Sequence, residues 1–473
     1  MSAEREHFSS KLGFILAAAG SAVGIGNLVG FPVAAAKNGG GAFLFIYALF
    51  VILICLPVMM AEMAFGRHTN KDPLGAYSKL SDNDKKWRIA GWLGVITPYM
   101  IGVFYLVITV WIFGYLFAAV TGDLDLLANP ETFGAFISSQ KLFLYMAVVV
   151  AITGAILMSG VKKGIERAAK VLMPALFLLL VLLVAYVLTL DNAFAGVSFY
   201  VLPDLSKIDA SVVSGALSQA FFSLSLGMGI LVTYGSYMSK KQDIADSSKL
   251  VALTDTGVAF VAGLLIMPAI FSFNPSVDPS ELSDSSISLI FVLLPEIFLS
   301  LQSDIGYFGA SAVASIFFLL VFFAAITSLV SIIEVPNASI MGEKNLDRKK
   351  SLAILTTAVV VLAVFASMSF GMSDFFGQFV SYAGAEKSLF DVIYDVFYDT
   401  ILPLNGLLVC LFVMFRWKKH NFNKEVEEGL AEGKHSFLLK YTDFALSTFI
   451  PVILAVIFIN TVALKFFGTN LLF

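Results

Sequence analysis

The chain has 473 residues, of which 58% are hydrophobic and only 14% are charged, and its mean hydropathy is +0.88. Soluble globular proteins of this size do not ordinarily reach such values, so the composition excludes the usual soluble enzymes and nucleic-acid-binding proteins. The net charge of −4 carries little information by itself. Apolar runs of about 20 residues recur from end to end, and about that length crosses a bilayer as a helix. We expect one multi-pass membrane domain over residues 1–473.

Eleven membrane-spanning helices follow from reading the apolar runs against turn and charge signals. The N-terminal segment lacks the small-residue cleavage site of a signal peptide, so we expect the first span to be retained. The expected spans, in chain order, are 11–36, 41–66, 89–120, 141–160, 165–190, 208–237, 248–272, 304–340, 350–370, 389–415 and 437–466.

Basic residues gather in alternate connections between these spans. One set of connections carries Arg5 and Lys11, residues 67–88, Lys162, Lys163 and Arg167, Lys240, Lys241 and Lys249, residues 344–350, and residues 416–440. The connections on the other side are acidic, with Asp123, Asp125 and Glu131, Asp191 and Asp204, Asp278, Glu281 and Asp284, and Asp374 and Glu386. Since basic loops stay in the cytoplasm, the N-terminus is predicted to be cytoplasmic and the C-terminus outside.

Glycines interrupt the first and the sixth span. The first contains GSAVGIGNLVGFP at residues 20–32, and the sixth contains QAFFSLSLGMGILVTYGSY at residues 219–237. Because these interruptions lie five spans apart, an odd number, two five-span units would have opposite orientations in the membrane. We therefore expect an all-helical, five-plus-five inverted repeat with broken helices 1 and 6. The first repeat is expected at about 10–190, the second at about 208–415, and an extra helix at about 437–466.

Unwound backbone at membrane depth needs polar partners for its N–H and C=O groups. Freed carbonyls suit a hard cation such as sodium, and the N-terminal ends of half-helices suit a carboxylate. Close helix packing is the alternative, since the glycines of the first span also match small-xxx-small spacing. The paired interruptions, with Asn27, Ser223 and Ser225 beside them, favour a binding site. Glu62 is expected to cap freed amides of a broken helix.

At these residues the chain resembles the neurotransmitter:sodium symporter family, of the solute carrier 6 type, and within it the bacterial amino-acid transporters. The resemblance runs through REHFSSKLGFILAAAGSAVGIGNLVGFP, NGGGAFLFIYALF, EMAFGR, FFSLSLGMGILVTYGSY, KKQDI and FFAAITSLVSIIEVP. It implies a sodium-coupled symporter without enzymatic activity, working by alternating access through the two broken helices.

The resemblance implies two sodium sites. The first would use the carbonyl of Ala22 with Asn27, Ser223 and Asp255, completed by the carboxylate of the substrate. The second would use the carbonyls of Gly20, Val23 and Ala324 with the hydroxyls of Thr327 and Ser328. All are oxygen ligands, as hard cations require. Without the resemblance, the two hydroxyls would be interpreted as ordinary back-bonding within a helix.

Asp255 lies in the middle of an apolar span, where an unpaired carboxylate is usually functional. Family members with a neutral residue here often need chloride or a nearby carboxylate. Tyr47, Gln219 and Ser223 match chloride-site positions of the family, while Ala259 stands where some bacterial members carry a glutamate. We expect Asp255 to remove the requirement for chloride.

A substrate pocket is implied by the same correspondence. It would be lined by Ser21, Ala22, Ile25, Gly26, Ile101, Tyr105, Phe222, Ser223, Ser225, Met228, Ser328 and Ile332. Monoamine transporters of the family carry an aspartate at the position of Gly24, whereas glycine leaves room for an amino acid that brings its own carboxylate. A neutral, hydrophobic L-amino acid is the simplest ligand, and another small zwitterionic amino acid or an amine is the alternative.

A cytoplasmic gate is implied by Arg5 and Tyr237, although the acidic partner of the family is replaced by Gly342, with Glu343 adjacent. Gly164 and Pro174 resemble a motif that lets the cytoplasmic half of the fifth span unwind. Proline favours such a break because it removes an amide donor. A simple kink is the alternative.

The outer gate departs from the family pattern. Where the family usually has an arginine that pairs with an acidic residue of span ten, this chain has Gly30. Asp391, Asp395 and Asp399 are spaced by four and share one face of span ten, with Asp395 nearest the acidic position. Without the arginine, we expect them to bind water or another cation such as Lys37.

Three other functions are weighed against the symporter. An intramembrane enzyme is disfavoured because all four histidines fall in predicted cytoplasmic segments. A channel would show a repeated short filter, which is not evident. A proton-coupled transporter would replace the hydroxyl ligands of the second sodium site. We expect a monomeric functional unit in a bacterial inner membrane.

Overall fold

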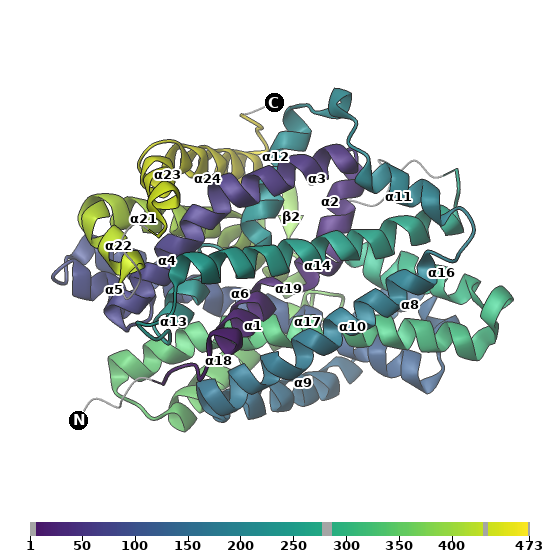
Figure 1. The fold of residues 1–473 in the computed structure, drawn as a ribbon. Coiled ribbons are helices and arrows are strands. Elements are labelled where there is room, and N and C mark those ends of the chain that lie inside the picture. The colour runs from purple at the N-terminus through teal and green to yellow at the C-terminus, as the bar shows by residue number, and fades with distance from the viewer. Residues whose placement is uncertain (1–5, 277–285, 429–433, 472–473) are drawn as a thin grey trace.

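The computed structural model describes residues 6–276, 286–428 and 434–471, and most of these residues lie in helices (Figure 1). The first five spans are α1 (Lys11–Ala22) with η1 (Gly26–Gly30) and α2 (Phe31–Lys37); α3 (Gly41–Phe50) with η2 (Val51–Cys55) and α4 (Leu56–Thr69); α6 (Lys85–Thr121); α9 (Lys141–Met158); and η3 (Val161–Glu166) with α10 (Arg167–Val187). Shorter helices connect them, namely α5 (Pro73–Leu80), α7 (Leu124–Leu127) and α8 (Pro130–Ile137), and α11 (Ala193–Val201) with η4 (Leu205–Lys207) follows the fifth span.

The second half follows the same plan. Its spans are α12 (Ala210–Ser223) with α13 (Ile230–Gly235); α14 (Ile244–Phe273); α17 (Gln302–Lys344); α18 (Arg348–Met368); α20 (Leu389–Ile393) with η7 (Tyr394–Ile401), α21 (Leu402–Leu411) and η8 (Phe412–Arg416); and α24 (Phe449–Phe467). The connecting elements are α15 (Ser286–Ser288), η6 (Leu289–Leu293), α16 (Leu294–Ser300), α19 (Asp374–Gly377), α22 (Lys419–Glu427) and α23 (Ser436–Ser447). An antiparallel hairpin of β1 (Val380–Tyr382) and β2 (Ala385–Lys387) pairs Ser381 with Glu386.

The described residues contain nine helices that are long and apolar enough to cross a membrane. A tenth span is the pair Lys11–Ala22 and Gly26–Lys37, which is bent by 57°. The sixth predicted span is divided between the short helices α12 and α13. The predicted all-helical, multi-pass fold with broken first and sixth helices is therefore confirmed.

The predicted eleventh span, 437–466, is wrong in its start. α23 and α24 meet at Thr448, whose φ and ψ of −125° and −88° are not helical. Pro451 lies in the first turn of α24, where its missing N–H is tolerated. Only α24 has the length and hydropathy of a span.

Side chains mark where several spans begin and end. Ser10, Asp243 and Asp347 each accept a hydrogen bond from a backbone N–H in the first turn of the helix that follows. α4 and α17 end at Asn70 and Asn345, which take left-handed backbone conformations. These capping residues lie in the polar connections between spans, where they mark the residues at which the helices begin and end.

The eighth span, α17, forms the centre of the molecule. In its most apolar window 83% of the residues are buried, compared with 17% in α24 at the periphery. Figure 1 shows the purple first span crossing the middle of the bundle, with α17 and α14 beside it. The broken span thus lies inside the protein, where polar backbone can be satisfied without contacting lipid.

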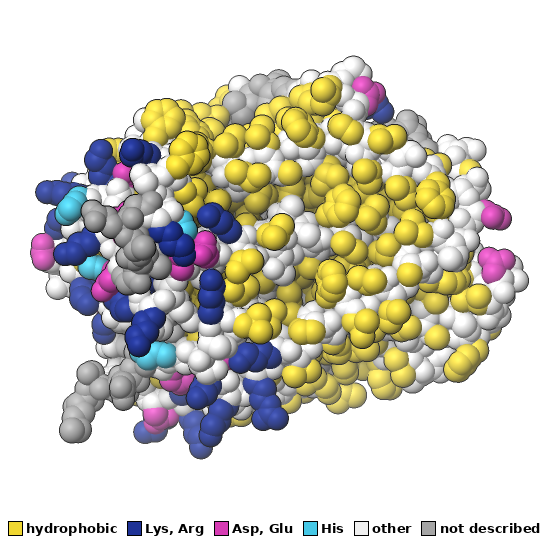
Figure 2. All heavy atoms as spheres, in the orientation of Figure 1, with side chains coloured by type: hydrophobic (Ala, Val, Ile, Leu, Met, Phe, Trp, Pro, Cys, Tyr) yellow, Lys and Arg dark blue, Asp and Glu magenta, His cyan; other side chains and the backbone are white. Residues whose placement is uncertain are grey.

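Figure 2 shows a broad band of hydrophobic side chains across the middle of this face, with Lys and Arg concentrated at one end. This basic end carries α22 and the described start of the chain (Figure 1). The asymmetry agrees with a cytoplasmic N-terminus.

Candidate functional site

The first break lies between α1 and η1. Val23 ends α1 in an extended conformation, with φ −69° and ψ 97°. Pro32 stands in the first turn of α2, where its missing N–H is tolerated. The Oδ1 of Asn27 accepts a hydrogen bond from the N–H of Gly24 over 3.1 Å. The side chain of Asn27, which follows the break, therefore satisfies a backbone N–H that the broken helix leaves without a helical partner.

The second break lies between α12 and α13. Ser225, Gly227 and Gly229 have positive φ values of 54°, 77° and 69°. Glycine adopts this left-handed backbone without strain. A Cβ at Gly227 would also clash with the carbonyl oxygen of Leu402. The two glycines that interrupt the sequence pattern are therefore required by both conformation and space.

Glu62 of α4 satisfies the backbone of the second break. Its Oε1 accepts the N–H of Gly227 over 2.8 Å. From the other side, Asn405 donates to the carbonyl of Gly227 and to Oγ1 of Thr97, each over 3.1 Å. The prediction that Glu62 caps a freed amide is confirmed, whereas no sequence signal pointed to Asn405 or Thr97.

Replacing Glu62 with alanine is expected to destabilise the protein by about 1–3 kcal/mol, because the buried N–H of Gly227 would lose its acceptor. Thermal unfolding of the purified protein in detergent measures this loss. Glu62→Gln keeps an acceptor oxygen and similar volume, so it should retain most of the stability. Equal losses for both variants would show that this hydrogen bond is not the source of the stabilisation.

Asp255 of α14 is fully buried beside the first break. Its Oδ1 accepts from Nδ2 of Asn27 over 2.7 Å, and its Oδ2 accepts from Oγ of Ser223 over 2.8 Å and from the hydroxyl of Tyr47 over 3.5 Å. Nδ2 of Asn27 also lies 2.9 Å from Oγ of Ser223. The structure thus joins three side chains of the predicted first sodium set, and Ala22 ends α1 at the same break.

Ser328 of α17 joins the first break to the eighth span. Its Oγ lies 3.3 Å from the carbonyl oxygen of Val23 and 3.5 Å from that of Gly20. Thr327 lies beside Gly20, with its Cβ 3.5 Å from the place that a Cβ on Gly20 would take. Oγ1 of Thr327 donates to the carbonyl of Ala324 over 3.0 Å. The structure therefore brings together all five residues of the predicted second sodium set.

The ligand atoms of both predicted sodium sites are of the kind that sodium prefers. Each consists of carbonyl, hydroxyl, amide or carboxylate oxygens, which are the ligands of hard cations. Within the described part of the chain, Asp255 contacts hydroxyl and amide groups but no Lys or Arg. A buried carboxylate is costly unless it is paired, so a bound cation would stabilise this one.

Polar side chains of the predicted pocket meet at the breaks. The hydroxyl of Tyr105 accepts the N–H of Ile25 over 3.4 Å. Ser225 and Ser328 donate to the carbonyl of Ser21 over 3.4 and 3.0 Å. Oγ of Ser21 is buried and has no hydrogen-bond partner among the described residues. Buried hydroxyls normally find a partner, so a polar group of a ligand would be well placed here.

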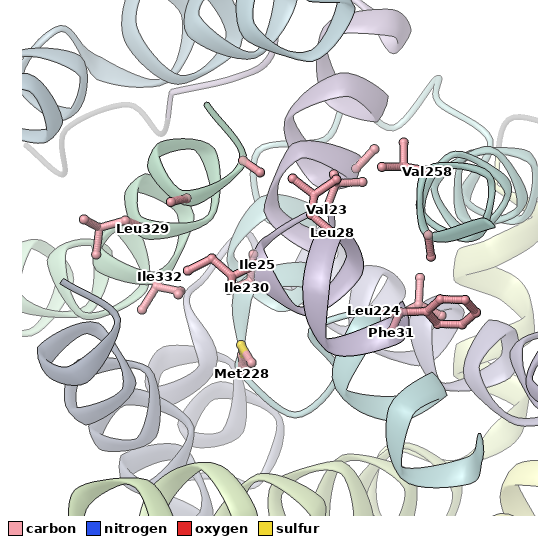
Figure 3. Close-up of a cluster of buried hydrophobic side chains, with 14 of the residues drawn as sticks. Val23, Ile25, Leu28, Phe31, Leu224, Met228, Ile230, Val258, Leu329 and Ile332 are labelled. Atoms are coloured by element: carbon pink, nitrogen blue, oxygen red, sulfur yellow. The ribbon is translucent and has the colours of Figure 1, made fainter. Parts of the chain in front are cut away.

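Apolar side chains of the predicted pocket lie nearby. In Figure 3, Ile25 from the first break and Ile332 from α17 point toward one another, with Met228 from the second break beneath them. Ile332 also packs on α6, since its Cγ2 lies 3.4 Å from the place of a Cβ on Gly102, next to Ile101. Four spans therefore contribute to one apolar region.

Glycines shape the space between these groups. A Cβ on Gly26 would meet no heavy atom within 4 Å, so this position borders open space. A Cβ on Gly24 would lie 2.7 Å from the hydroxyl of Tyr105 and 2.9 Å from Oγ of Ser328. The ring of Phe222 stacks on Tyr398 of η7 with centroids 5.0 Å apart. The contact with Tyr398 was not foreseen from the sequence.

The cytoplasmic end is closed by a buried ion pair that sequence reasoning missed. Arg348 donates to both oxygens of Glu334 over 2.9 Å, and the hydroxyl of Tyr237 donates to Oε1 of Glu334 over 2.8 Å. Arg5, the predicted gate residue, lies outside the described residues. Glu343, beside the position where an acid was expected, pairs with Arg88. An acidic residue inside an apolar span was the signal for Glu334.

A second cytoplasmic cluster ties α22 to the membrane domain. Oε1 of Glu425 lies 2.7 Å from Nε of Arg67, and its Oε2 lies 2.9 Å from Nδ1 of His68 and 2.7 Å from Nζ of Lys240. Burial raises the pKa of Glu425, but hydrogen bonds from His68, Lys240 and Arg67 outweigh it and lower the pKa from 4.5 to about 2.

Acid is therefore expected to remove a stabilising contribution of Glu425 between about pH 5 and pH 2. Because its folded pKa is lowered, the contribution is complete above the unfolded pKa and is lost as the pH falls through the folded one. The difference in melting temperature between wild type and Glu425→Gln should be largest near pH 7 and shrink toward pH 2. Glu428→Gln is the control, since Glu428 also pairs with Lys240 but is half-exposed. A difference that stays constant over this range contradicts the prediction.

The fifth span is continuous in the structure. η3 is π-helical at Gly164, and α10 then runs through Pro174 without a break. The N-terminal segment contacts this region, since Ser9 donates its backbone N–H to Glu166 over 2.7 Å. Unwinding between Gly164 and Pro174 is not observed and stays a prediction.

At the outer end, Asp395 has cationic partners other than the suggested Lys37. Its Oδ1 lies 2.9 Å from Nζ of Lys465 in α24, and its Oδ2 lies 3.8 Å from Nζ of Lys387 in β2. The sequence alone did not indicate Lys465, because it lies 70 residues away along the chain.

Comparison with known proteins agrees with this arrangement. A model of the sodium:neurotransmitter symporter family matches residues 5–132 and 131–468. The chain is 35% identical over 469 residues to an uncharacterized sodium-dependent transporter of Bacillus subtilis, YhdH, covering 97% of this chain and 98% of that protein. It is 28% identical over 341 residues to the human sodium- and chloride-dependent taurine transporter, covering 62% of this chain and 54% of that protein.

A solved structure is similar over nearly the full length. The crystal structure of MhsT in complex with L-phenylalanine matches with a TM-score of 0.82 and 38% sequence identity, covering 96% of this chain and 99% of that chain.

Proposed function

This chain belongs to the sodium:neurotransmitter symporter family, and from that membership we propose that it imports a neutral, hydrophobic L-amino acid by alternating access. It is a sodium-dependent, multi-pass membrane transporter and not an enzyme. The substrate class is inferred from one observation: polar and apolar side chains lie close together around the two broken spans. Ser21 and Ser225 offer polar contacts, while Ile25, Met228 and Ile332 offer an apolar surface.

The absence of a charged side chain at Gly24 supports an amino acid over an amine. A carboxylate at this position would pair with an amine, whereas glycine places no negative charge near the carboxylate of an amino-acid ligand. MhsT was crystallised with L-phenylalanine, and that match favours a large apolar side chain. Another zwitterionic amino acid, or an amine, is the second candidate.

We also propose that two sodium ions are carried with each amino acid. One would bind Ala22, Asn27, Ser223 and Asp255, and the other would bind Gly20, Val23, Ala324, Thr327 and Ser328. The clustering of these residues at the first break supports both sites. Proton coupling is the alternative, and the two adjacent hydroxyls of Thr327 and Ser328 disfavour it.

Chloride should not be required. Asp255 supplies a fixed negative charge within hydrogen-bond distance of Tyr47 and Ser223, so a second anion beside it would be repelled. We propose a monomer as the functional unit. The short basic loops and the similarity to a Bacillus subtilis protein support a bacterial inner membrane.

A binding panel tests the substrate class. Purified protein in detergent is heated with each natural amino acid in sodium chloride, sodium gluconate and potassium chloride. A rise in melting temperature with apolar amino acids, in both sodium salts but not in potassium, is expected. A preference for amines, or stabilisation that needs chloride, contradicts the proposal.

A further inference from the structure

Two carboxylates lie close together near the outer end of the tenth span. Asp395 and Asp399 are four residues apart in η7, so they share one face of the helix. Asp395 is only 4% exposed, and the side chain of Asp399 is 15% exposed. Two buried carboxylates side by side repel each other and lose hydration, so a cation between them stabilises the arrangement.

That cation is Lys465, in the last turn of α24. Its Nζ lies 2.9 Å from Oδ1 of Asp395 and 2.6 Å from Oδ2 of Asp399. Lys387 is farther away, at 3.8 Å from Asp395. One lysine of the final helix therefore bridges both carboxylates and fixes η7 to α24.

The residues next to this bridge contact the proposed pocket. Tyr398 precedes Asp399, and its ring stacks on Phe222 with centroids 5.0 Å apart and lies 4.9 Å from the ring of Tyr394. Phe222 lies at the second break, beside the residues proposed to bind substrate. A shift of η7 would therefore move the aromatic contact that covers this side of the pocket.

The extracellular hairpin belongs to the same assembly. The hydroxyl of Tyr382 in β1 donates to Oδ2 of Asp395 over 2.8 Å. The ring of Tyr382 also packs on Phe466 of α24, with centroids 5.2 Å apart. The hairpin, η7 and α24 thus meet around one carboxylate pair.

We propose that Lys465 is a positioning residue of the outer gate, which holds η7 and Tyr398 over the pocket from the final helix. The inference rests on the proposed symporter function. Opening the pocket to the outside then requires the bridge from Lys465 to Asp395 and Asp399 to break. The last helix, α24, lies at the periphery of the bundle, yet its Lys465 would release η7 each time the pocket opens to the outside.

Hydrogen–deuterium exchange of Lys465→Gln in sodium, without any amino acid, tests the bridge directly. Amides of residues 389–401 should exchange at least about tenfold faster than in wild type, because a buried pair has lost its cation. Amides of α5 and α22, at the cytoplasmic end, should not change. Lys465→Arg should restore protection, and Lys387→Gln is the matched control because it removes a more distant positive charge from the same carboxylate.

A second measurement separates this inference from the proposed function. Dissociation of bound radiolabelled L-phenylalanine in sodium should be at least about tenfold faster in Lys465→Gln, with little change in Lys387→Gln. Unchanged exchange at 389–401 overturns the role of Lys465, whatever the ligand result. Faster exchange in all helices also overturns it, because that would indicate general destabilisation. If wild type binds no apolar amino acid of the panel but exchange changes only at 389–401, the bridge holds and the substrate class fails.

Discussion

Replacing Asp255 with alanine is expected to reduce sodium-driven uptake by about a hundredfold or more. The substitution removes the only carboxylate that the protein supplies to the two proposed sodium sites. It also removes an acceptor from both Asn27 and Ser223, which now donate to that carboxylate. Initial rates of amino-acid uptake into proteoliposomes, measured over a range of sodium concentrations, provide the test.

Asp255→Asn separates charge from shape, because it keeps the size of the side chain and one acceptor oxygen. Its uptake should be low without chloride and should rise when chloride is added, since an external anion can then supply the missing charge. Thr254→Ala is the matched control on the same helix, because Thr254 is only partly buried and its hydroxyl donates to the carbonyl of Leu250 in its own helix. Wild-type uptake in Asp255→Asn without chloride would rule out the assigned role.

Gly24→Ala is expected to lower uptake by at least about tenfold and to weaken sodium binding. Its Cβ would lie within 3 Å of both the hydroxyl of Tyr105 and Oγ of Ser328. Ser328 belongs to the proposed second sodium site, and Tyr105 contacts the N–H of Ile25. One methyl group would therefore disturb the pocket and the ion site together. Sodium titration of the melting temperature, with uptake assays, measures both effects.

The variant Gly24→Ala with Tyr105→Phe provides the internal check. Removing the hydroxyl of Tyr105 makes room for the added methyl group, so the double variant should transport better than Gly24→Ala alone. Gly257→Ala in α14 is the control, because a Cβ there meets no heavy atom within 4 Å. If Gly24→Ala transports like wild type, the close contacts of Gly24 with Tyr105 and Ser328 are not needed for transport.

Much of the fold could be predicted from the sequence because lipid allows few solutions. Every membrane span must be an apolar helix, and basic loops report the orientation. The two breaks were visible because closely spaced glycines, such as Gly227 and Gly229, interrupt two spans that lie five spans apart. The start of α24 was missed since the apolar pattern continues through Thr448, although Pro451 was a usable signal.

The rest of the site depends on contacts between distant segments. Asn405 reaches Gly227 across 178 residues, and Lys465 reaches Asp395 across 70. Neither residue belongs to a local motif, so its partner is defined only when the helices pack. The ion pair of Glu334 and Arg348 spans 14 residues across one turn, and each residue alone was compatible with several partners.

Uptake driven by a sodium gradient tests the central claim most directly. Proteoliposomes containing wild type or Asp255→Ala receive the radiolabelled amino acid that binds best in the panel, with an inward gradient of sodium or of choline at equal osmolarity. Concentrative uptake by wild type in sodium alone, collapsed by a sodium ionophore and absent from Asp255→Ala, is the predicted result. Equal uptake in sodium and choline would contradict sodium coupling through this site.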